Sequence, residues 1–392
     1  MITYPFDTPA GSDVEPEGLR LLAMGQVARA SMNGYPVWLA LAYPAVRQVL
    51  SDPRFSREAA ASGDGPVANP AAANPDFLSS MDPPKHTRVR RMVANAFSPR
   101  MVERLQPSIQ AIVNALLDGL VDHGKPADLV GLLAEPLPIM VICQLLGVPI
   151  EDRPQIRRWA GKLVADTAVP PAEIAAAMHQ VNAYLDELIA MKRRTPDDAL
   201  ISALIAVNDQ GDRLTAAELT ANLQLLLIAG HETTVSQLGN CVVTLFRHPD
   251  QATLLTSRPE LLDGAVDELL RYSRLFSAVL PRVATEEVSL GETVIRPGEV
   301  VVPLVSVANR DPAAFDEPNR FDITRTGPAP HTAFGHGPHF CLGAQLARLE
   351  LRIALGELWR RFPALAPAVE LDDLNWKSGL AIRSLRALPA LW

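Results

Sequence analysis

Cysteine, aromatic residues and long apolar runs are all scarce in this chain. Three cysteines, Cys143, Cys241 and Cys341, occur among 392 residues, which is too few and too scattered for a disulfide framework. No run of about 18 apolar residues is present, and this excludes a transmembrane helix. The first residues lack the basic start and the apolar stretch of a signal peptide. We therefore expect a cytoplasmic protein that does not enter a membrane.

The charge balance narrows the class of partner. Lys and Arg number 36 against 44 Asp and Glu, a net charge of −8, which argues against nucleic acid as a partner. Hydrophobic residues make up 48% of the chain. This excludes wholesale disorder, because disordered chains combine low hydrophobicity with high net charge. We expect a globular protein with a substantial core.

Apolar periodicity predicts a mainly α-helical fold with a minor β-sheet region. Residues at i, i+3 and i+4 spacing predict helices over Met101–Asp122, Pro136–Gly147, Pro171–Arg194, Ala216–Phe246, Pro259–Ser273 and Leu342–Phe362. Strand-forming residues gather at Tyr35–Leu41 and in short runs within Val279–Val307. No linker separates two cores, so we expect a single domain, residues 1–392, whose sheet joins distant parts of the chain.

The segment Ser56–Lys85 differs from its surroundings. It is rich in Ala, Pro, Gly, Asn and Ser and has almost no periodicity. Long loops inside compact domains are usually functional lids or disordered. We interpret this segment as a flexible lid.

The longest predicted helix carries an unusual interruption. Thr215 and Glu218 have the spacing of a capping box, which predicts that the helix Ala216–Phe246 begins there. Its apolar pattern is broken by the sequence GHETT, which starts at Gly230. In one interpretation Gly230 allows close helix packing and Glu232 faces solvent. In the other, the helix opens locally, and freed carbonyl and hydroxyl groups handle protons or a small ligand.

Cys341 ends a glycine-rich loop, residues 331–343, with a predicted helix directly after it. A sulfur at a helix N-terminus is stabilised as a thiolate by backbone N–H groups, and Phe334 and Phe340 are placed to shield it from water. Three interpretations fit: an inert buried cysteine, a catalytic nucleophile, or an axial thiolate ligand of a metal cofactor. Zinc is disfavoured, because the other two cysteines do not have ligand spacing.

The pattern Phe334-x-x-Gly337-x-x-x-Cys341-x-Gly343 resembles the haem-binding signature of the cytochrome P450 family, the haem-thiolate monooxygenases. Ala229-Gly230-His231-Glu232-Thr233 resembles the family's oxygen-activation motif, which lies in its long central helix. This resemblance implies the family's fold, a triangular prism of mainly α structure around a buried haem b.

Two further motifs extend the resemblance over essentially the whole chain. Glu268-x-x-Arg271 resembles the family's E-x-x-R motif, with Arg320 as the usual third partner in a structural ion-pair network. His86-x-x-x-Arg90 follows a sequence typical of bacterial members. His86 and Arg90 are four residues apart, so we expect them on one helical face.

The resemblance assigns the haem contacts. Cys341 is the axial ligand of the haem iron, since a thiolate pushes electron density onto iron and favours O–O cleavage. The propionates, which are carboxylates, are expected to bind His86, Arg90, Arg282 and His339. The remaining haem-binding residues that the motifs imply are Ala229, Phe334, Gly335 and Gly343.

Glu232 and Thr233 resemble the family's acid–alcohol pair, which delivers protons to haem-bound dioxygen. Under this hypothesis Thr233 holds the bound oxygen by a hydrogen bond, and Glu232 relays protons inward. The pair is intact, so we expect O₂ chemistry rather than use of peroxide.

The resemblance leaves the substrate open. Positions that would line the distal pocket are mostly small and aliphatic, which favours a medium or large apolar organic molecule and a role in bacterial secondary metabolism. The candidate substrate-binding residues are Phe77, Met81, Ala229, Phe276, Val279 and Leu380. Hydroxylation or epoxidation is the leading hypothesis, and oxidative C–C or C–O coupling by the same haem is the alternative. A non-catalytic haem-fold protein for recruitment or sensing is a third, disfavoured by the intact motifs.

Electrons are expected from a separate ferredoxin and its ferredoxin reductase, because the sequence has no fused reductase. Such ferredoxins are acidic and need a basic docking surface. Arg88, Arg91, Arg348 and Arg352 are the residues we expect to supply it. A monomer is the default expectation.

Overall fold

The computed structural model describes all residues except 1, 7–10, 12, 63–73, 95–96, 164–169, 210–213, 277–279, 328 and 378–381. Helices dominate the described part of the chain, as predicted. They are α1 (Pro16–Met24), α2 (Tyr43–Ser51), α3 (Arg57–Ser62), α4 (Lys85–Ala94), α5 (Pro99–His123), α6 (Pro136–Leu146), α7 (Arg153–Leu163), α8 (Pro171–Arg194), α9 (Leu200–Asp209), α10 (Ala216–Arg247), α11 (Pro249–Ser257), α12 (Leu262–Tyr272), α13 (Val305–Ala308) and α14 (Ala344–Arg361).

The six predicted helices are confirmed, with small shifts at their ends. The largest shift is in α12, which begins at Leu262 because Pro259–Leu261 forms a separate 3₁₀ turn. In the described ranges, no helix combines the length and the apolarity that a membrane span requires.

The main sheet joins strands that are far apart in sequence. Its order is β1 (Ile2–Tyr4), β2 (Val27–Met32), β3 (Tyr35–Ala40), β9 (Val300–Pro303), β6 (Arg282–Ala284) and β4 (Phe55–Ser56). The predicted strands at Tyr35–Leu41 and within Val279–Val307 are confirmed, and they pair in parallel, Val37 opposite Val300. Two smaller sheets contain β10 (Ala366–Pro367), β11 (Pro389–Leu391) and β5 (Ala127–Asp128), and the hairpin of β7 (Val288–Leu290) and β8 (Thr293–Ile295).

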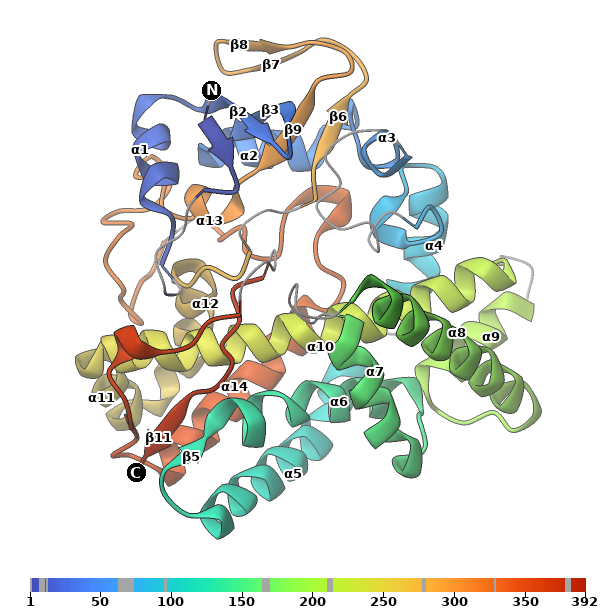
Figure 1. Ribbon diagram of the computed structural model, residues 1–392, viewed down its shortest axis with the longest axis vertical. Coiled ribbons are helices and arrows are strands. Elements are labelled where there is room, and N and C mark those ends of the chain that lie inside the picture. The colour runs from blue at the N-terminus through green and yellow to red at the C-terminus, as the bar shows by residue number, and fades with distance from the viewer. Residues whose placement is uncertain are drawn as a thin grey trace.

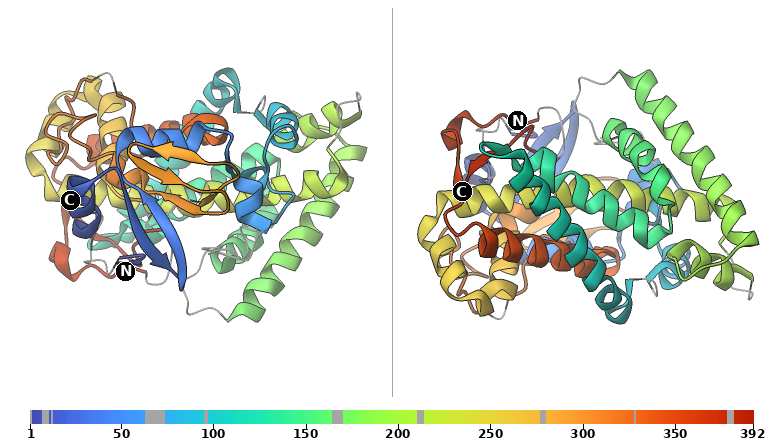
Figure 2. Two further views of the ribbon diagram at one scale, coloured as in Figure 1. Left: turned by 90° about the horizontal axis from the view of Figure 1, so that it is seen from above. Right: turned by 90° about the horizontal axis from the view of Figure 1, so that it is seen from below.

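Helix α10 crosses the molecule between the sheet side and the helical side (Figure 1). Seen from below, α6 and α14 lie against α10, and α5 lies against both α6 and α14 (Figure 2). Every residue from Thr234 to Leu245 is buried, which requires a helix surrounded on all sides. The predicted capping box is confirmed: Glu218 N donates to Thr215 Oγ1 at 3.0 Å, and Thr215 N donates to Glu218 Oε2 at 2.9 Å.

The helix is continuous through Gly230. A Cβ at Gly230 would lie 3.4 Å from Ile142 Cδ1 on α6, which is an ordinary contact distance. The helix does not open at the GHETT sequence, and a packing role for Gly230 stays a prediction. Glu232, however, is only 3% exposed, so the expectation that it faces solvent is also wrong.

The lid segment is more ordered at both ends than its composition predicts. Arg57–Ser62 is the helix α3, and residues 63–73 lie outside the described part of the chain. At the far end, Leu78 N donates to Asn222 Oδ1, and Asn222 Nδ2 donates to Asp76 O, both at 2.9 Å. Asn222 on α10 thus holds residues 76–78 by two backbone hydrogen bonds.

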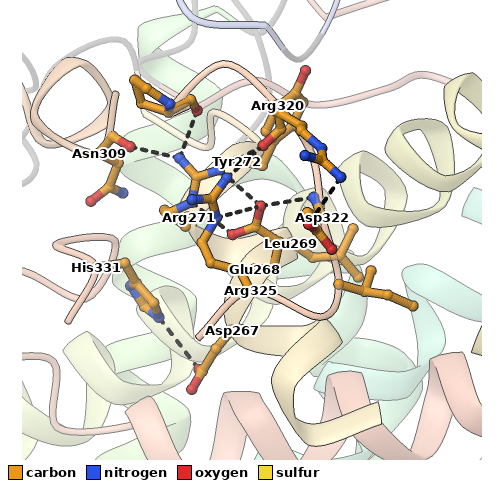
Figure 3. A network of polar contacts seen from close by, with 12 residues as sticks. Asp267, Glu268, Leu269, Arg271, Tyr272, Asn309, Arg320, Asp322, Arg325 and His331 are labelled. Atoms are coloured by element: carbon orange, nitrogen blue, oxygen red, sulfur yellow. Dashed lines mark hydrogen bonds and ion pairs between the residues drawn. The ribbon is translucent and has the colours of Figure 1, made fainter. Parts of the chain in front are cut away.

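A buried ion-pair network fixes the chain that follows the main sheet (Figure 3). Glu268 and Arg271 on α12 pair at 2.7 Å, and each side chain is 3% exposed. Arg271 also donates to the carbonyls of Asn309 and Pro318, both at 2.8 Å. Burial of this pair is favourable only because these additional hydrogen bonds satisfy the guanidinium.

The prediction that the Arg320 side chain is the third partner of the network is wrong. That side chain is 61% exposed and pairs with Glu317 and Asp322, because only its carbonyl, which accepts from Arg271 at 3.3 Å, faces the network. Arg325 takes the place instead: its Nε lies 3.2 Å from Glu268 Oε1.

Removing the central carboxylate tests this network. Glu268→Ala should lower the free energy of unfolding by about 3–5 kcal/mol, because it leaves buried guanidinium groups without their counter-charge. Arg325→Ala should cost about 1–3 kcal/mol, whereas Arg320→Ala at the exposed site should cost less than about 1 kcal/mol. Urea unfolding followed by circular dichroism measures all three. An equal cost for Arg320→Ala and Arg325→Ala would contradict the assignment of the third partner.

Candidate active site

One face of α10 is more accessible than the rest of the helix. Leu225, Leu226, Ala229, Gly230 and Thr233 are half-buried or exposed, and their spacing places them on one side. Ala229 is the most accessible of these although the helix runs through the centre of the protein. The interruption in the apolar pattern therefore coincides with a surface that a ligand can reach.

The predicted acid and alcohol lie on this stretch but have different partners. Thr233 Oγ1 donates to Ala229 O at 2.6 Å, one turn earlier in the helix. Glu232 Oε1 accepts from Ser384 Oγ at 3.0 Å, and Lys377 Nζ lies 3.3 Å from the same oxygen. Burial raises the pKa of Glu232, and the Lys377 ammonium acts in the opposite direction.

The predicted tight loop before Cys341 is confirmed. Gly335 and Gly337 have φ of +73° and +69°, a conformation that favours glycine. A Cβ at Gly337 would lie 2.6 Å from the Leu50 carbonyl oxygen, so no other residue fits there. The loop closes where Cys341 N donates to Phe334 O at 2.9 Å. As a result Cys341 is accessible, whereas Cys143 and Cys241 are buried.

Protein groups around the sulfur act on its pKa in opposite directions. Although Cys341 is accessible, the protein atoms around its sulfur displace much of the water, and this desolvation raises the pKa of the thiol. The N–H of Gly343 and the guanidinium groups of Arg90 and Arg348 lower it. Helix α14 begins at Ala344, so its N-terminus follows the cysteine as predicted, but the burial effect outweighs it. Among the described residues, no three His, Cys, Asp or Glu side chains gather as a metal site.

The predicted propionate-binding residues lie together. The rings of His86 and His339 are 4.2 Å apart, and His339 is close enough to Arg282 and Arg90 for their charges to act on it. Arg90 also donates to Phe340 O at 2.6 Å, which ties α4 to the cysteine loop.

Arg57 is a member of this cationic group that sequence patterns did not reveal. It is buried at the start of α3, where it donates to Ser79 O at 3.0 Å and to Pro281 O. Its charge acts on both Arg282 and His339. No motif marks Arg57, because its partners are backbone carbonyls from distant segments.

The cationic group fits an anionic ligand. Burial, together with the charges of neighbouring guanidinium groups, lowers the pKa of His86 to about 4 and that of His339 to about 2, so both rings are neutral at pH 7. Burial also lowers the pKa of Arg282, with the charge of Arg57 acting in the same direction. Buried His86 Nε2 has no hydrogen-bond partner within the described part of the chain. Arg57 and Arg282 are the buried cations of this group, and Asp82 is the anion that acts on both. Buried cations normally have counter-charges, so two carboxylates of a haem, which would also accept from the neutral imidazoles, match this donor set.

The predicted substrate-binding residues have mixed outcomes. Phe77 and Met81 are 3% and 1% exposed. They offer almost no surface to a ligand, because their apolar side chains pack into the protein interior, so the prediction for these two is not supported. Phe276 is half-buried beside Ile382 and keeps an accessible side chain. Val279 and Leu380 lie outside the described residues.

Comparisons with known proteins agree with this geometry. The family model described as Cytochrome P450 matches residues 170–258 and 255–388. Nocardicin C N-oxygenase of Nocardia uniformis subsp. tsuyamanensis is 43% identical over 393 residues, which cover 100% of this chain and 98% of that protein. The family model thus covers the central helix and the cysteine loop, and the N-oxygenase aligns with the whole chain.

Solved structures give the same result for the fold. The LnmA cytochrome P450 hydroxylase from the leinamycin pathway of Streptomyces atroolivaceus superposes with a TM-score of 0.94 at 43% identity, covering 100% of both chains. A cytochrome P450 with biaryl coupling reactivity superposes with a TM-score of 0.93 at 37% identity, covering 100% of this chain and 99% of that one. The fold and the resemblance predicted from the motifs are thus confirmed, and the chain belongs to the cytochrome P450 family of haem-dependent monooxygenases.

Proposed function

We propose that this enzyme uses O₂ to hydroxylate or epoxidise a medium-to-large apolar organic molecule in bacterial secondary metabolism. The observation that carries the proposal is the pairing of an accessible thiol with a buried cationic group. Arg90 connects the two, because its charge acts on both Cys341 and His339. The names of the relatives, an N-oxygenase and a hydroxylase of natural-product pathways, support this class of substrate.

Each predicted residue has a role in holding the cofactor. Cys341 would ligate the iron, while Gly335 and Gly337 let the loop approach it closely. His86, Arg90, Arg282 and His339 would bind the propionates, and Arg57 would add positive charge behind them. When bound, the haem supplies the redox chemistry. Phe334, under the guanidinium of Arg348 at 4.6 Å, would shield the sulfur from water.

Thr233 and Glu232 are the groups we propose for proton handling. The Thr233 hydroxyl is on the accessible face of α10, where it would orient an oxygen atom by a hydrogen bond. Glu232 is buried directly beside it and has a raised pKa, which favours a carboxyl group that both takes up and releases protons.

Oxidative coupling is the second candidate reaction. It is favoured by the solved relative with biaryl coupling reactivity, which is 37% identical to this chain. The same haem site serves both reactions, so the fold does not separate them. The mass of the product distinguishes the two reactions, because insertion adds one oxygen atom and coupling removes two hydrogen atoms.

We further propose that an acidic ferredoxin, reduced by its reductase, docks beside α14. Arg348 and Arg352 border a groove between α5, α12 and α14. They pair with Asp267 at 2.7 Å and with Asp263 at 3.3 Å, so a partner carboxylate would compete with these exposed acids. Arg88 is less suited than its sequence position predicts, because it pairs with buried Glu218. We also propose that residues 1–392 form a single domain, that the protein is a monomer and that it is located in the cytoplasm.

The ligand of the iron is tested by the visible spectrum. Reduced, haem-loaded protein exposed to carbon monoxide should give a strongly red-shifted Soret band, and Cys341→Ala should lose it, because the shift requires an axial thiolate. Cys241→Ala, at a buried cysteine, is the matched control and should keep the band. A haem-loaded wild type without the shifted band would favour the recruitment or sensor alternative.

The propionate site is tested by haem retention. Arg282→Met should speed haem transfer to apomyoglobin by about 10-fold or more, since a charged hydrogen bond contributes roughly 1.5–3 kcal/mol. Arg320→Met, at the exposed site on the far side of the ion-pair network, should leave the transfer rate unchanged. Equal rates for Arg282→Met and wild type would contradict the assignment of Arg282.

The docking surface is tested by charge reversal on α14. Arg352→Glu should slow reduction by a [2Fe–2S] ferredoxin by about 3-fold or more at low salt, with the difference shrinking as salt rises. Arg360→Glu reverses an exposed charge farther along the same helix and should have little effect. Stopped-flow reduction under carbon monoxide measures both, and equal rates for the two variants would contradict docking at this surface.

A further inference from the structure

The N-terminal segment that precedes α1 is held by arginines from distant parts of the chain. Arg274, two residues after the end of α12, forms an ion pair with Glu15. Arg383, in the C-terminal segment, donates from Nε to Gly11 O at 3.0 Å. The start of the chain is therefore attached both to the segment after α12 and to the segment near the C-terminus.

The ion pair of Glu15 and Arg274 is almost completely removed from solvent. The side chain of Arg274 is 0% exposed and that of Glu15 is 3% exposed. Among the described residues, the Arg274 guanidinium has no partner other than Glu15, whereas buried Arg271 also donates to backbone carbonyls. A buried guanidinium is costly unless an anion neutralises it. The burial of Arg274 therefore depends on one carboxylate, which the N-terminal segment supplies.

The backbone that carries Arg274 lies against α10. Gln237 Nε2 donates to Ser273 Oγ at 2.7 Å, and Asn240 Nδ2 donates to Arg274 O at 3.2 Å. Asn240 follows Thr233 by about two helical turns, so both residues lie on the same side of α10. The segment after α12 therefore borders the accessible face of α10 at the end beyond Thr233.

The same backbone positions Phe276, the predicted substrate-binding residue that keeps an accessible side chain. Phe276 forms an antiparallel bridge with Ile382 of the C-terminal segment. One residue earlier, Leu275 O accepts from Arg383 N at 2.7 Å. The two backbone segments are thus joined to each other directly beside Arg274.

The loss of one partner has different consequences for the two sides of the pair. A buried carboxyl group without its cation can take up a proton and stay inside the protein, and burial already raises the pKa of Glu15. A guanidinium keeps its proton in proteins, so Arg274 without its anion has to move toward water. Because Phe276 is two residues away, this movement would displace the backbone that positions it.

We propose that Glu15 is a positioning residue for the substrate pocket, which neutralises Arg274 and thereby holds Phe276 at the accessible face of α10. The N-terminal segment then influences how tightly a large ligand binds, although it lies outside every motif of the site. This inference rests on the proposed function, which places a medium or large apolar substrate at that face.

Titrations of haem-loaded protein with two azoles test the proposal, followed by the change in the Soret band as the azole nitrogen binds iron. Imidazole needs room only at the iron, whereas clotrimazole is an imidazole that carries three aromatic rings. The ratio of their dissociation constants therefore measures how well the pocket accepts a large apolar group. The variants are Glu15→Met, Arg274→Met and the double variant. Asp13→Asn is the matched control, because Asp13 is an exposed acid of the same segment, paired with Arg247 at 2.8 Å.

Glu15→Met should raise the dissociation constant of clotrimazole relative to that of imidazole by about 10-fold or more, because it leaves the Arg274 guanidinium without an anion. The double variant should return this ratio to within about 3-fold of wild type, since a buried apolar pair needs no counter-charge. Arg274→Met alone should have a smaller effect than Glu15→Met, and Asp13→Asn should have none. A role in stability alone would lower the Tm of Glu15→Met and leave the ratio unchanged.

An unchanged ratio in Glu15→Met, or a double variant that does not restore it, would overturn the proposal. If Glu15→Met yields no haem-loaded protein, Glu15→Gln, which removes the charge and keeps the shape, is measured in its place and should raise the same ratio. A wild type that binds imidazole but not clotrimazole would contradict the large apolar pocket of the proposed function, and this inference with it. The carbon monoxide band is recorded for every variant, so that a failure of the haem-thiolate site itself is recognised separately.

Discussion

The buried pair of Glu268 and Arg271 is the interaction on which the position of the Cys341 loop depends. Arg271 holds the carbonyl of Asn309, and the Asn309 side chain accepts from Thr332 N at 2.7 Å and Thr332 Oγ1 at 2.9 Å. Thr332 lies at the start of the loop that ends in Cys341. A charge pair on α12 is thus connected, through two sets of hydrogen bonds, to the segment that presents the sulfur. Buried ion pairs add little net stability, but they strongly disfavour alternative arrangements in which one charge is unpaired.

Electrostatics divides the site into two parts with opposite requirements. On one side, Arg57 and Arg282 are buried cations that share Asp82 as a nearby anion, an arrangement that the carboxylates of a haem would stabilise further. On the other, Glu232 is a buried anion that its own protein neutralises through Lys377. The first part is suited to hold a permanent ligand. The second is suited to change its charge during a reaction, because its counter-ion is already present and partly exposed.

The relatives show how far one site can diverge in chemistry. An N-oxygenase, a hydroxylase and an enzyme with biaryl coupling reactivity share this fold at 37–43% identity. Substrate and reaction outcome are therefore not set by the fold and the haem chemistry alone. This is also where the sequence-based assignments were weakest, since Phe77 and Met81 are packed inside the protein.

The sequence by itself determined the features that depend on residues close together in the chain. The capping box at Thr215, the turn glycines before Cys341 and the pairing of Glu268 with Arg271 each require contacts over a few residues, so spacing alone predicts them. The tertiary structure decided the rest. Arg325 replaced Arg320 in the network, Arg57 joined the cationic group, and Lys377 became the counter-ion of Glu232. Each of these depends on which backbone segments meet after folding, and long-range contacts of that kind leave no periodic or short-range signature in the sequence.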